Sequence, residues 1–395
     1  MTPDHVIGAS HNRDLTTGQL AIVTVGRLAL VAAFRIVYPL QPFLTGELAV
    51  DLRTIGALIT VQLAASMLSP VGGAMADTRG ERTTMIIALV TFVLGTLLCA
   101  LSPTFGAFLA AYALVGIAVA LYQPAAQAYL SARTPYGRRG WALGIFETSW
   151  ALGALAGVAP LMYLVEATRR SSPVFWTLLA AGLISLVLVW LLLPGNGATI
   201  RSRAQPVDWS ALRAGGALAA LLFMALTLCA YDMVQIVQAA WLEETLAVSE
   251  AQLGQLFALA GIGELAGSLG VALLGDRLGI RRSVAITFGL TALCIAVLPL
   301  AGGAWELLLP TYLLLYVVFE YGIVATFPLI SAIAPLARGT MLAFGTAATG
   351  AGRVIASLVA TPLWLAHGMG WTAGVAAAII VTALLLLLNV RPAEE

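Results

Sequence analysis

Seven charged residues lie within long apolar runs of this sequence, namely Arg27, Arg35, Glu147, Asp232, Glu264, Glu320 and Arg353. A charge inside a membrane is costly, so such residues normally face a cavity, bind a solute, carry protons or pair with one another. A buried pair can also be a structural contact that fixes helix packing. These residue types predict movement of a charged solute or a proton, with the four carboxylates as proton-coupling candidates and the three arginines as ion-pair or substrate candidates.

The depths of these charges indicate which of them could meet. The helical rise of about 1.5 Å per residue places Arg27 about 14 Å and Glu147 about 11 Å from the same side, so they could pair. Arg353, Glu320 and Glu264 approach the midplane. The latter two are the preferred proton carriers, because a buried carboxyl without an arginine partner exchanges a proton more readily. If Arg353 pairs with Glu320, Glu264 is the freer carboxyl.

The composition places these runs in lipid and excludes several classes of protein. The chain is 60% hydrophobic and 10% charged, whereas a soluble domain is roughly a quarter charged. All twenty basic residues are arginine, so a phosphate-binding loop with its lysine is absent. Three scattered histidines and three cysteines in apolar runs predict no metal site and no disulfide. We predict no enzyme, no cofactor and no nucleic-acid partner.

Twelve apolar runs are long enough to cross a bilayer as helices, which takes about 20 residues. They span 18–41, 54–76, 83–101, 105–131, 140–166, 174–193, 211–240, 253–274, 283–301, 306–332, 340–366 and 371–390. We predict an all-α integral membrane protein with six-helix bundles over 18–193 and 211–390, a linker over 194–210, and tails over 1–17 and 391–395.

The arginines of the connecting loops predict the orientation of the chain. Twelve of them lie in the even-numbered loops and three in the odd-numbered loops. Positive residues are retained on the cytoplasmic side of a membrane. We therefore expect a multi-pass protein of the plasma membrane with both termini in the cytoplasm.

The two predicted bundles share sequence features at a nearly constant spacing. Leu48-Ala49-Val50 recurs as Leu246-Ala247-Val248, and Asp77 and Arg82 recur as Asp276 and Arg281, with offsets of 198 and 199 residues. Two similar bundles in the same orientation commonly enclose a central site that opens to each side in turn. The repeat therefore favours a transporter, although duplication without transport is the alternative.

The loop Gly73-Ala74-Met75-Ala76-Asp77-Thr78-Arg79-Gly80-Glu81-Arg82 resembles the G-x-x-x-D-R-x-G-R-R motif of the major facilitator superfamily, and Gly275 to Arg282 keeps its core in the second bundle. The resemblance covers essentially the whole chain and implies a twelve-helix transporter that works as a monomer. In that family the motif latches the two bundles together on the cytoplasmic side. It implies this role for Gly73, Asp77, Arg79, Gly80, Arg82, Asp276, Arg277, Gly279 and Arg281.

The fifth run carries Gly144, Gly153 and Gly157 and is similar to the glycine-rich motif of the drug:proton antiporter branch. Val158 stands where that motif has proline, and close helix packing explains the glycines equally well. Tyr112 stands in the fourth run where the proton-coupled branch has arginine. These departures leave the antiporter and packing interpretations both open.

The resemblance also implies which polar residues line the cavity, because the first, fourth, seventh and tenth helices do so in the family. The candidates are Tyr38, Gln41, Tyr122, Gln123, Gln127, Tyr231, Gln235, Gln238, Tyr316 and Tyr321. The first and seventh helices face each other across that cavity, so Arg35 and Asp232 are expected to pair as an external gate.

Three functions remain in competition. The leading prediction is proton-coupled export of a small amphipathic or hydrophobic compound. The three intramembrane arginines favour the second, an uptake permease, facilitator or lipid flippase for an anionic solute. The third is a membrane scaffold or sensor without transport, which would have no need for the two latch motifs.

Overall fold

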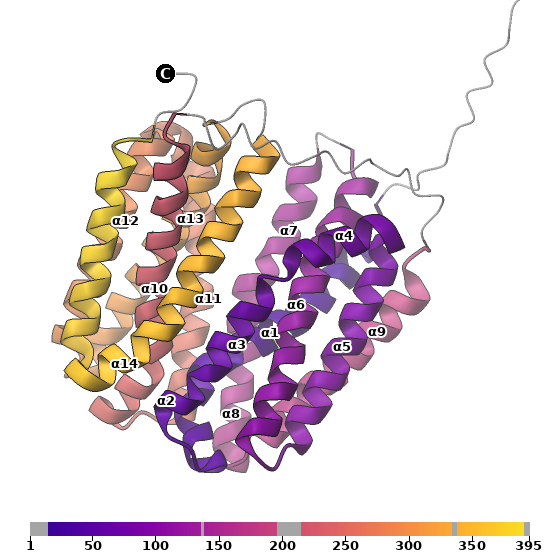
Figure 1. Ribbon diagram of the computed structural model, residues 1–395, viewed down its shortest axis with the longest axis horizontal. Coiled ribbons are helices and arrows are strands. Elements are labelled where there is room, and N and C mark those ends of the chain that lie inside the picture. The colour runs from indigo at the N-terminus through magenta and orange to yellow at the C-terminus, as the bar shows by residue number, and fades with distance from the viewer. Residues whose placement is uncertain (1–14, 136–137, 196–214, 334–337, 391–395) are drawn as a thin grey trace, which may run out of the picture.

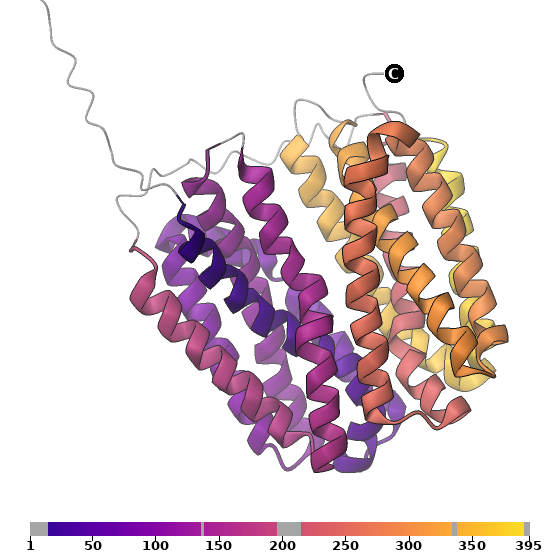
Figure 2. The same ribbon diagram turned by 180° about the vertical axis from the view of Figure 1, so that it is seen from behind.

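The computed structural model describes residues 15–135, 138–195, 215–333 and 338–390 as helices and short connections, with no strand among them. Two groups of helices stand side by side (Figures 1 and 2). The first group comprises α1 (Thr17–Leu48), α2 (Leu52–Ile55), α3 (Ala57–Ser66), α4 (Ser69–Arg79), α5 (Glu81–Leu101), α6 (Phe105–Arg133), α7 (Arg139–Leu152), η2 (Gly153–Val158), α8 (Ala159–Thr168) and α9 (Ser172–Leu192). The second comprises α10 (Ala217–Leu246), α11 (Glu250–Leu278), α12 (Ile280–Ala301), α13 (Trp305–Ser331) and α14 (Arg338–Leu387).

Eleven stretches of the described chain are long and apolar enough to cross a membrane. The last of them contains Gly368, whose φ of 78° and ψ of 179° interrupt the helical conformation of α14. This glycine divides α14 into two spans, so the predicted twelve-helix layout is confirmed. The predicted tails and most of the predicted linker lie outside the described residues.

Several helices run further than the hydropathy pattern predicts. The first extends to Leu48 and contains Pro39 and Pro42, neither of which ends it. Proline removes the N–H that would bond the carbonyl four residues earlier, and for Pro42 that carbonyl belongs to Tyr38. The Gln41 amide donates to this Tyr38 carbonyl at 3.4 Å. The side chain thus partly replaces the missing backbone bond.

Two predicted spans are divided into pieces. The second consists of α2, α3 and α4. Asp51 caps α2 by accepting the Thr54 N–H at 2.7 Å, and hydrogen bonds from the Thr54 side chain and N–H lower the pKa of the Asp51 carboxyl. The fifth consists of α7, η2 and α8, where η2 is one turn of π-helix. Such turns are rare and often occur at functional sites.

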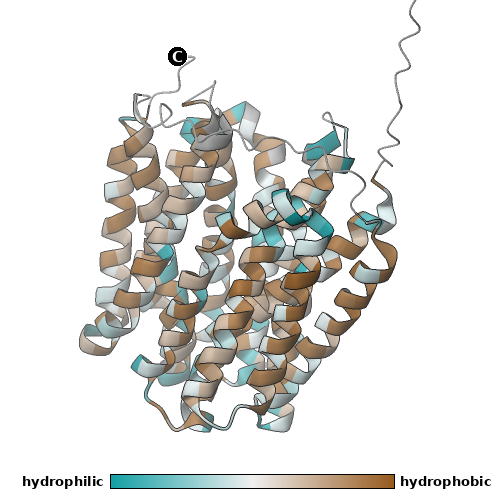
Figure 3. Cartoon of the chain, turned by 45° about the vertical axis from the view of Figure 1, so that its right-hand side comes forward, coloured by the Kyte–Doolittle hydropathy of each residue, from teal (hydrophilic) through white to brown (hydrophobic). Residues whose placement is uncertain are grey.

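Hydropathy is distributed as expected for a protein surrounded by lipid. Figure 3 shows apolar segments along the outer faces of the helices, with hydrophilic segments at helix ends and in the interior. Leu273 and Leu300 are 72% and 82% exposed. Large exposed apolar surface on a polytopic helical chain marks contact with lipid.

The end of the bundle at which α1 begins carries the arginines of the motif loops, and we call it the arginine-rich end. Arg82 donates to the carbonyls of Val189 and Trp190 near the end of α9. Arg281 donates to those of Leu387 and Leu388 at the end of α14, at 3.1 and 3.0 Å. The last carbonyls of a helix lack backbone donors. Each arginine therefore donates hydrogen bonds to the free carbonyls at the end of the sixth span of its own group.

The two groups of helices approach each other at the opposite end and diverge toward the arginine-rich end (Figures 1 and 2). The Glu166 carboxylate of α8 accepts the Ala251 N–H of α11 at 2.6 Å. Next to this contact, Arg169 and Glu250 form an ion pair at 3.2 Å. A carboxylate at a helix N-terminus satisfies a free N–H and complements the helix dipole. These contacts close the opposite end.

Candidate functional site

A cavity of about 180 Å³ lies between the two groups of helices. Its walls combine five charged side chains with aromatic and apolar ones: Phe34, Arg35, Tyr38, Trp150, Leu228, Tyr231, Asp232, Gln235, Phe257, Ala260, Glu264, Tyr316, Phe319, Glu320, Ile323 and Arg353. The charged residues come from α1, α10, α11, α13 and α14, so both groups contribute to one site.

One wall is a buried ion pair that joins the two groups. Arg35 of α1 donates through Nη1 and Nη2 to the two carboxylate oxygens of Glu264 on α11, at 2.7 and 2.8 Å. The same guanidinium donates to the Trp150 carbonyl at 3.2 Å and lies 4.9 Å from the Trp150 ring centroid. A two-point contact of this kind is among the stronger ion pairs in proteins. It ties α1 to α11 at the level of the cavity.

A second ion pair lies on another wall. Arg353 of α14 donates through Nε to Asp232 of α10 at 2.7 Å and through Nη2 to the Tyr38 hydroxyl at 3.3 Å. The predicted pairing of Arg35 with Asp232 is therefore wrong. Both lie at a suitable depth, but α10 packs against α14 within one group, so the Asp232 carboxylate meets Arg353.

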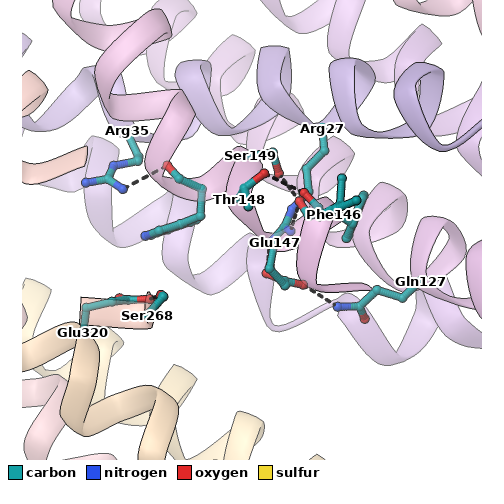
Figure 4. Close-up of polar contacts among 11 residues, drawn as sticks. Arg27, Arg35, Gln127, Phe146, Glu147, Thr148, Ser149, Ser268 and Glu320 are labelled. Atoms are coloured by element: carbon teal, nitrogen blue, oxygen red, sulfur yellow. Dashed lines mark hydrogen bonds and ion pairs between the residues drawn. The ribbon is translucent and has the colours of Figure 1, made fainter. Parts of the chain in front are cut away.

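Glu320 stands apart from both ion pairs. Its Oε1 accepts the Ser268 hydroxyl at 3.0 Å, and among the described residues no basic side chain forms an ion pair with it. Figure 4 shows Glu320 and Ser268 away from the Arg35 guanidinium. The condition under which Glu264 would be the freer carboxyl, a pair between Arg353 and Glu320, is not met, because Arg353 pairs with Asp232 and Glu264 with Arg35. Glu320 is the carboxyl of the cavity that has no arginine partner in the described chain.

Arg27, Glu147 and Gln127 form a separate cluster within the first group, as Figure 4 shows. Arg27 pairs with Glu147 at 2.7 Å, as the depths predicted, and donates to the Phe146 carbonyl at 3.0 Å. Gln127 donates to the other oxygen of Glu147 at 3.0 Å. This cluster ties α1 to α6 and α7 and does not line the cavity.

The structure brings four of the predicted polar cavity residues to the cavity wall, namely Tyr38, Tyr231, Gln235 and Tyr316. It places others between helices of one group. The Tyr122 hydroxyl donates to the Val23 carbonyl of α1, and the Tyr321 hydroxyl donates to Ser283 of α12. Both predictions are corrected, because these hydroxyls find partners away from the cavity.

The remaining polar candidates also lie off the cavity wall. Gln41 donates to the Ile236 carbonyl of α10 at 3.0 Å, and this bond joins the two groups. Gln238 accepts the Tyr316 hydroxyl at 3.4 Å, while Gln123 and Gln127 are not among the lining residues. Arg35, Tyr38 and Gln41 are three residues apart on α1, so they share one helix face. Each of them reaches a different helix of the second group.

The family resemblance predicted the cavity tyrosines Tyr38, Tyr231 and Tyr316 but not the phenylalanines and Trp150 of the walls. Tyr231 stacks on Phe319 with ring centroids 3.5 Å apart and an interplanar angle of 5°. Phe34, Trp150 and Phe257 line the same cavity. An aromatic residue within an apolar helix looks the same whether it faces lipid or a site. Only the packing distinguishes the two.

Two of the three motif glycines of the fifth span, Gly153 and Gly157, pack against α1, which fits the packing interpretation of that motif. A Cβ on Gly153 would lie 2.4 Å from Val31 Cγ1, and one on Gly157 would lie 2.5 Å from Ala32 Cβ. Gly144 has open space around it. A close approach between the groups uses Gly261 of α11, which the sequence did not single out. A Cβ on Gly261 would lie 2.5 Å from the Ala151 carbonyl oxygen.

We expect Gly261→Ala to push the two groups apart, a change that labels at the opposite end can report. The new methyl would overlap a backbone carbonyl, and overpacking of this kind costs about 1–3 kcal/mol. In a cysteine-free background with spin labels at positions 170 and 244, both exposed at that end, the mean label distance should increase. Gly289→Ala is the control, because a Cβ there has open space. An unchanged distance would show that this contact does not set the closure.

Among the described residues of the motif loops, Arg82 and Arg281 each bind a helix of their own group. Gly80 and Gly279 have φ of 91° and 77°, which glycine adopts readily, and each precedes a helix. Asp77 is exposed and has no hydrogen bond or ion pair among the described residues. Arg79 and Arg277 lie exposed beside these turns, Gly73 has open space, and the Asp276 side chain lies outside the description. The latch role stays a prediction.

The spans, the split between two groups and the central charged cavity define a multi-pass membrane transporter. The sequence matches the family model of the Major Facilitator Superfamily over residues 23–237 and 220–395. The chain therefore belongs to the major facilitator superfamily. This membership confirms the family resemblance that the two loop motifs indicated.

Known relatives extend over most of the chain. The uncharacterized MFS-type transporter YwfA of Bacillus subtilis is 23% identical over 96% of this chain and 95% of its own length. The multidrug resistance protein MdtG of Enterobacter lignolyticus is 26% identical over 75% of this chain and 73% of its own. The crystal structure of a D-xylose-proton symporter superposes with a TM-score of 0.79 at 17% identity, covering 95% and 98% of the two chains. That likeness shows the fold.

Proposed function

We propose that this transporter exports a small amphipathic or hydrophobic compound in exchange for protons. The observation that carries the proposal is Glu320, a cavity carboxyl with no arginine partner in the described chain, beside two carboxyls that each hold an arginine. An unpaired carboxylate in a low-dielectric site is costly, so it favours binding a proton or a cationic group. Export is supported by the relation to a multidrug resistance protein.

The contacts between the groups indicate to which side of the membrane the cavity opens. The contacts of Glu166 and Gln41 join the two groups on the side of the opposite end, and the Arg35–Glu264 pair joins them at the cavity, while the groups diverge at the arginine-rich end. With the arginine-rich end in the cytoplasm, as the loop charges predict, this is a conformation that receives solute from the cytoplasm. Exchange then requires these contacts to break and the motif loops to meet. The working unit is a monomer in the plasma membrane, because one chain contains the whole cavity.

The ion pairs of the structure give less support to the alternative, transport of an anionic solute. Arg27, Arg35 and Arg353 each hold a carboxylate at 2.7 Å, so an anionic solute must displace one of them. A scaffold or sensor has no need for an unpaired carboxyl inside a cavity.

Purified protein in liposomes with an imposed pH difference tests the proposal. Chemically diverse amphiphiles and organic anions are added, and an internal pH-sensitive dye reports proton movement. We expect some amphiphiles to discharge the pH difference in a manner that needs the protein. Anion movement without proton flux would support the facilitator alternative, and absence of any solute movement would support a scaffold.

A further inference from the structure

We propose that the solute is a compact aromatic monocation whose charged head carries at least one N–H. This inference rests on the proposed function, since it names the class of solute at that same cavity. It follows from the charges of the cavity, its free hydrogen-bonding atoms, its aromatic walls and its size.

The cavity holds five charged side chains. Arg35 and Arg353 contribute two positive charges, and their partners Glu264 and Asp232 contribute two negative ones that cancel them. The remaining charge is that of Glu320. The cavity is therefore neutral when Glu320 carries a proton and has a charge of −1 when it does not. A monocation restores neutrality in the second case, so one proton and one monocation are interchangeable there.

At least two hydrogen-bond acceptors of the cavity lack a donor among the described residues. Gln235 lines the cavity, and its Oε1 is buried without a hydrogen-bond partner. One Glu320 oxygen accepts from Ser268, and the described residues donate no hydrogen bond to the other. The guanidinium groups of Arg35 and Arg353 already bind carboxylates. A buried acceptor without a donor costs about 1–3 kcal/mol, so a solute N–H would be stabilised here.

The walls and the volume fit an aromatic solute of small size. Phe257 and the stacked pair Tyr231 and Phe319 line the cavity, and aromatic rings have electron-rich faces. Such faces attract cations and stack on planar rings. Sites for drug-sized ligands measure about 300 Å³ or more, whereas this cavity measures about 180 Å³. A solute of one or two rings is the better match.

Three naphthalene compounds with one ring system and different heads test this inference. They are 1-(aminomethyl)naphthalene, a cation with N–H groups, its trimethylammonium analogue, a cation without them, and 1-naphthylacetate, an anion. Binding to the purified protein in detergent is measured by calorimetry, without any proton gradient. We expect the affinity to fall in that order, by roughly tenfold or more from first to last, as the loss of a hydrogen bond to a charged group implies.

Two substitutions test whether Glu320 and Gln235 bind the charged head of the solute. Glu320→Gln should weaken the aminomethyl compound by roughly tenfold to a hundredfold, and Gln235→Leu by roughly tenfold. Glu306→Gln is the matched control, because Glu306 lies exposed in the first turn of the same helix. Should Glu320→Gln fail to fold, the wild-type protein still decides the question: binding of the aminomethyl compound must release protons.

The outcomes separate this inference from the proposed function. Tighter binding of 1-naphthylacetate, failure of the aminomethyl compound to bind, or its unchanged affinity in both variants would overturn the aromatic-cation assignment. Proton-coupled movement of other amphiphiles would then still stand. Conversely, binding of the aminomethyl compound in the predicted order without proton-coupled transport would retain the solute class and refute the exchange mechanism.

Discussion

Replacing Glu320 with glutamine is expected to reduce solute-driven proton flux by roughly a hundredfold, the size of effect that loss of a proton-transfer group commonly has. The amide keeps the shape of the side chain and the contact with Ser268, but it carries no exchangeable charge. The flux is measured in liposomes at saturating solute, so weaker binding does not account for the loss.

The matched control for this prediction is again Glu306→Gln, which makes the same chemical change on α13 outside the cavity. It should leave the flux unchanged. If Glu320→Gln retained wild-type flux while Glu264→Gln or Asp232→Asn abolished it, the proton would have to be carried by one of the paired carboxyls. The role assigned to the unpaired one would then be wrong.

Breaking the pair between Arg35 and Glu264 is expected to have the largest effect on the conformation. Both side chains are buried, with 9% and 7% of their surface exposed. Removal of one partner leaves an unpaired buried charge, which costs about 3–5 kcal/mol, whereas replacing both with apolar residues is often neutral. Arg35→Met and Glu264→Leu should therefore each lower the thermal unfolding midpoint, and the double variant should recover it.

Although the double variant should recover the unfolding midpoint, it should no longer hold the two groups together at the opposite end. Because the pair joins α1 to α11, spin labels at positions 170 and 244 should move apart although the protein is stable. The pair of Arg169 and Glu250, in which the Arg169 side chain is 70% exposed, provides the control cycle, with a coupling energy of about 1 kcal/mol or less. Additive effects of Arg35→Met and Glu264→Leu on the midpoint would show that the buried pair is not a stabilising unit.

The sequence predicted the spans and all five charged residues of the cavity, because both depend on local properties. The length of an apolar run shows whether it can cross a bilayer. The free-energy cost of a charge inside that run marks the residue as functional, whichever helices surround it. Gly368 illustrates how well the pattern worked, since the break it makes in α14 falls between the predicted spans 340–366 and 371–390.

The partners of these charges could not be predicted in the same way. Depth along a helix does not show which neighbour a side chain faces, so Arg35 was paired with Asp232 instead of Glu264. Glu166 was missed because a carboxylate near the end of a span looks like an ordinary surface charge. Its role as a cap of α11 depends on a helix that lies 85 residues further along the chain.

Proton movement driven by a solute gradient alone tests the central claim most directly. Liposomes containing the purified protein are loaded with a solute identified in the screen and diluted into solute-free buffer of the same pH. Exchange through Glu320 predicts that solute leaving the liposomes draws protons in and builds a pH difference, and that Glu320→Gln builds none. Solute escape from the wild-type liposomes without a pH difference would contradict the account, as would an undiminished pH difference in the Glu320→Gln variant.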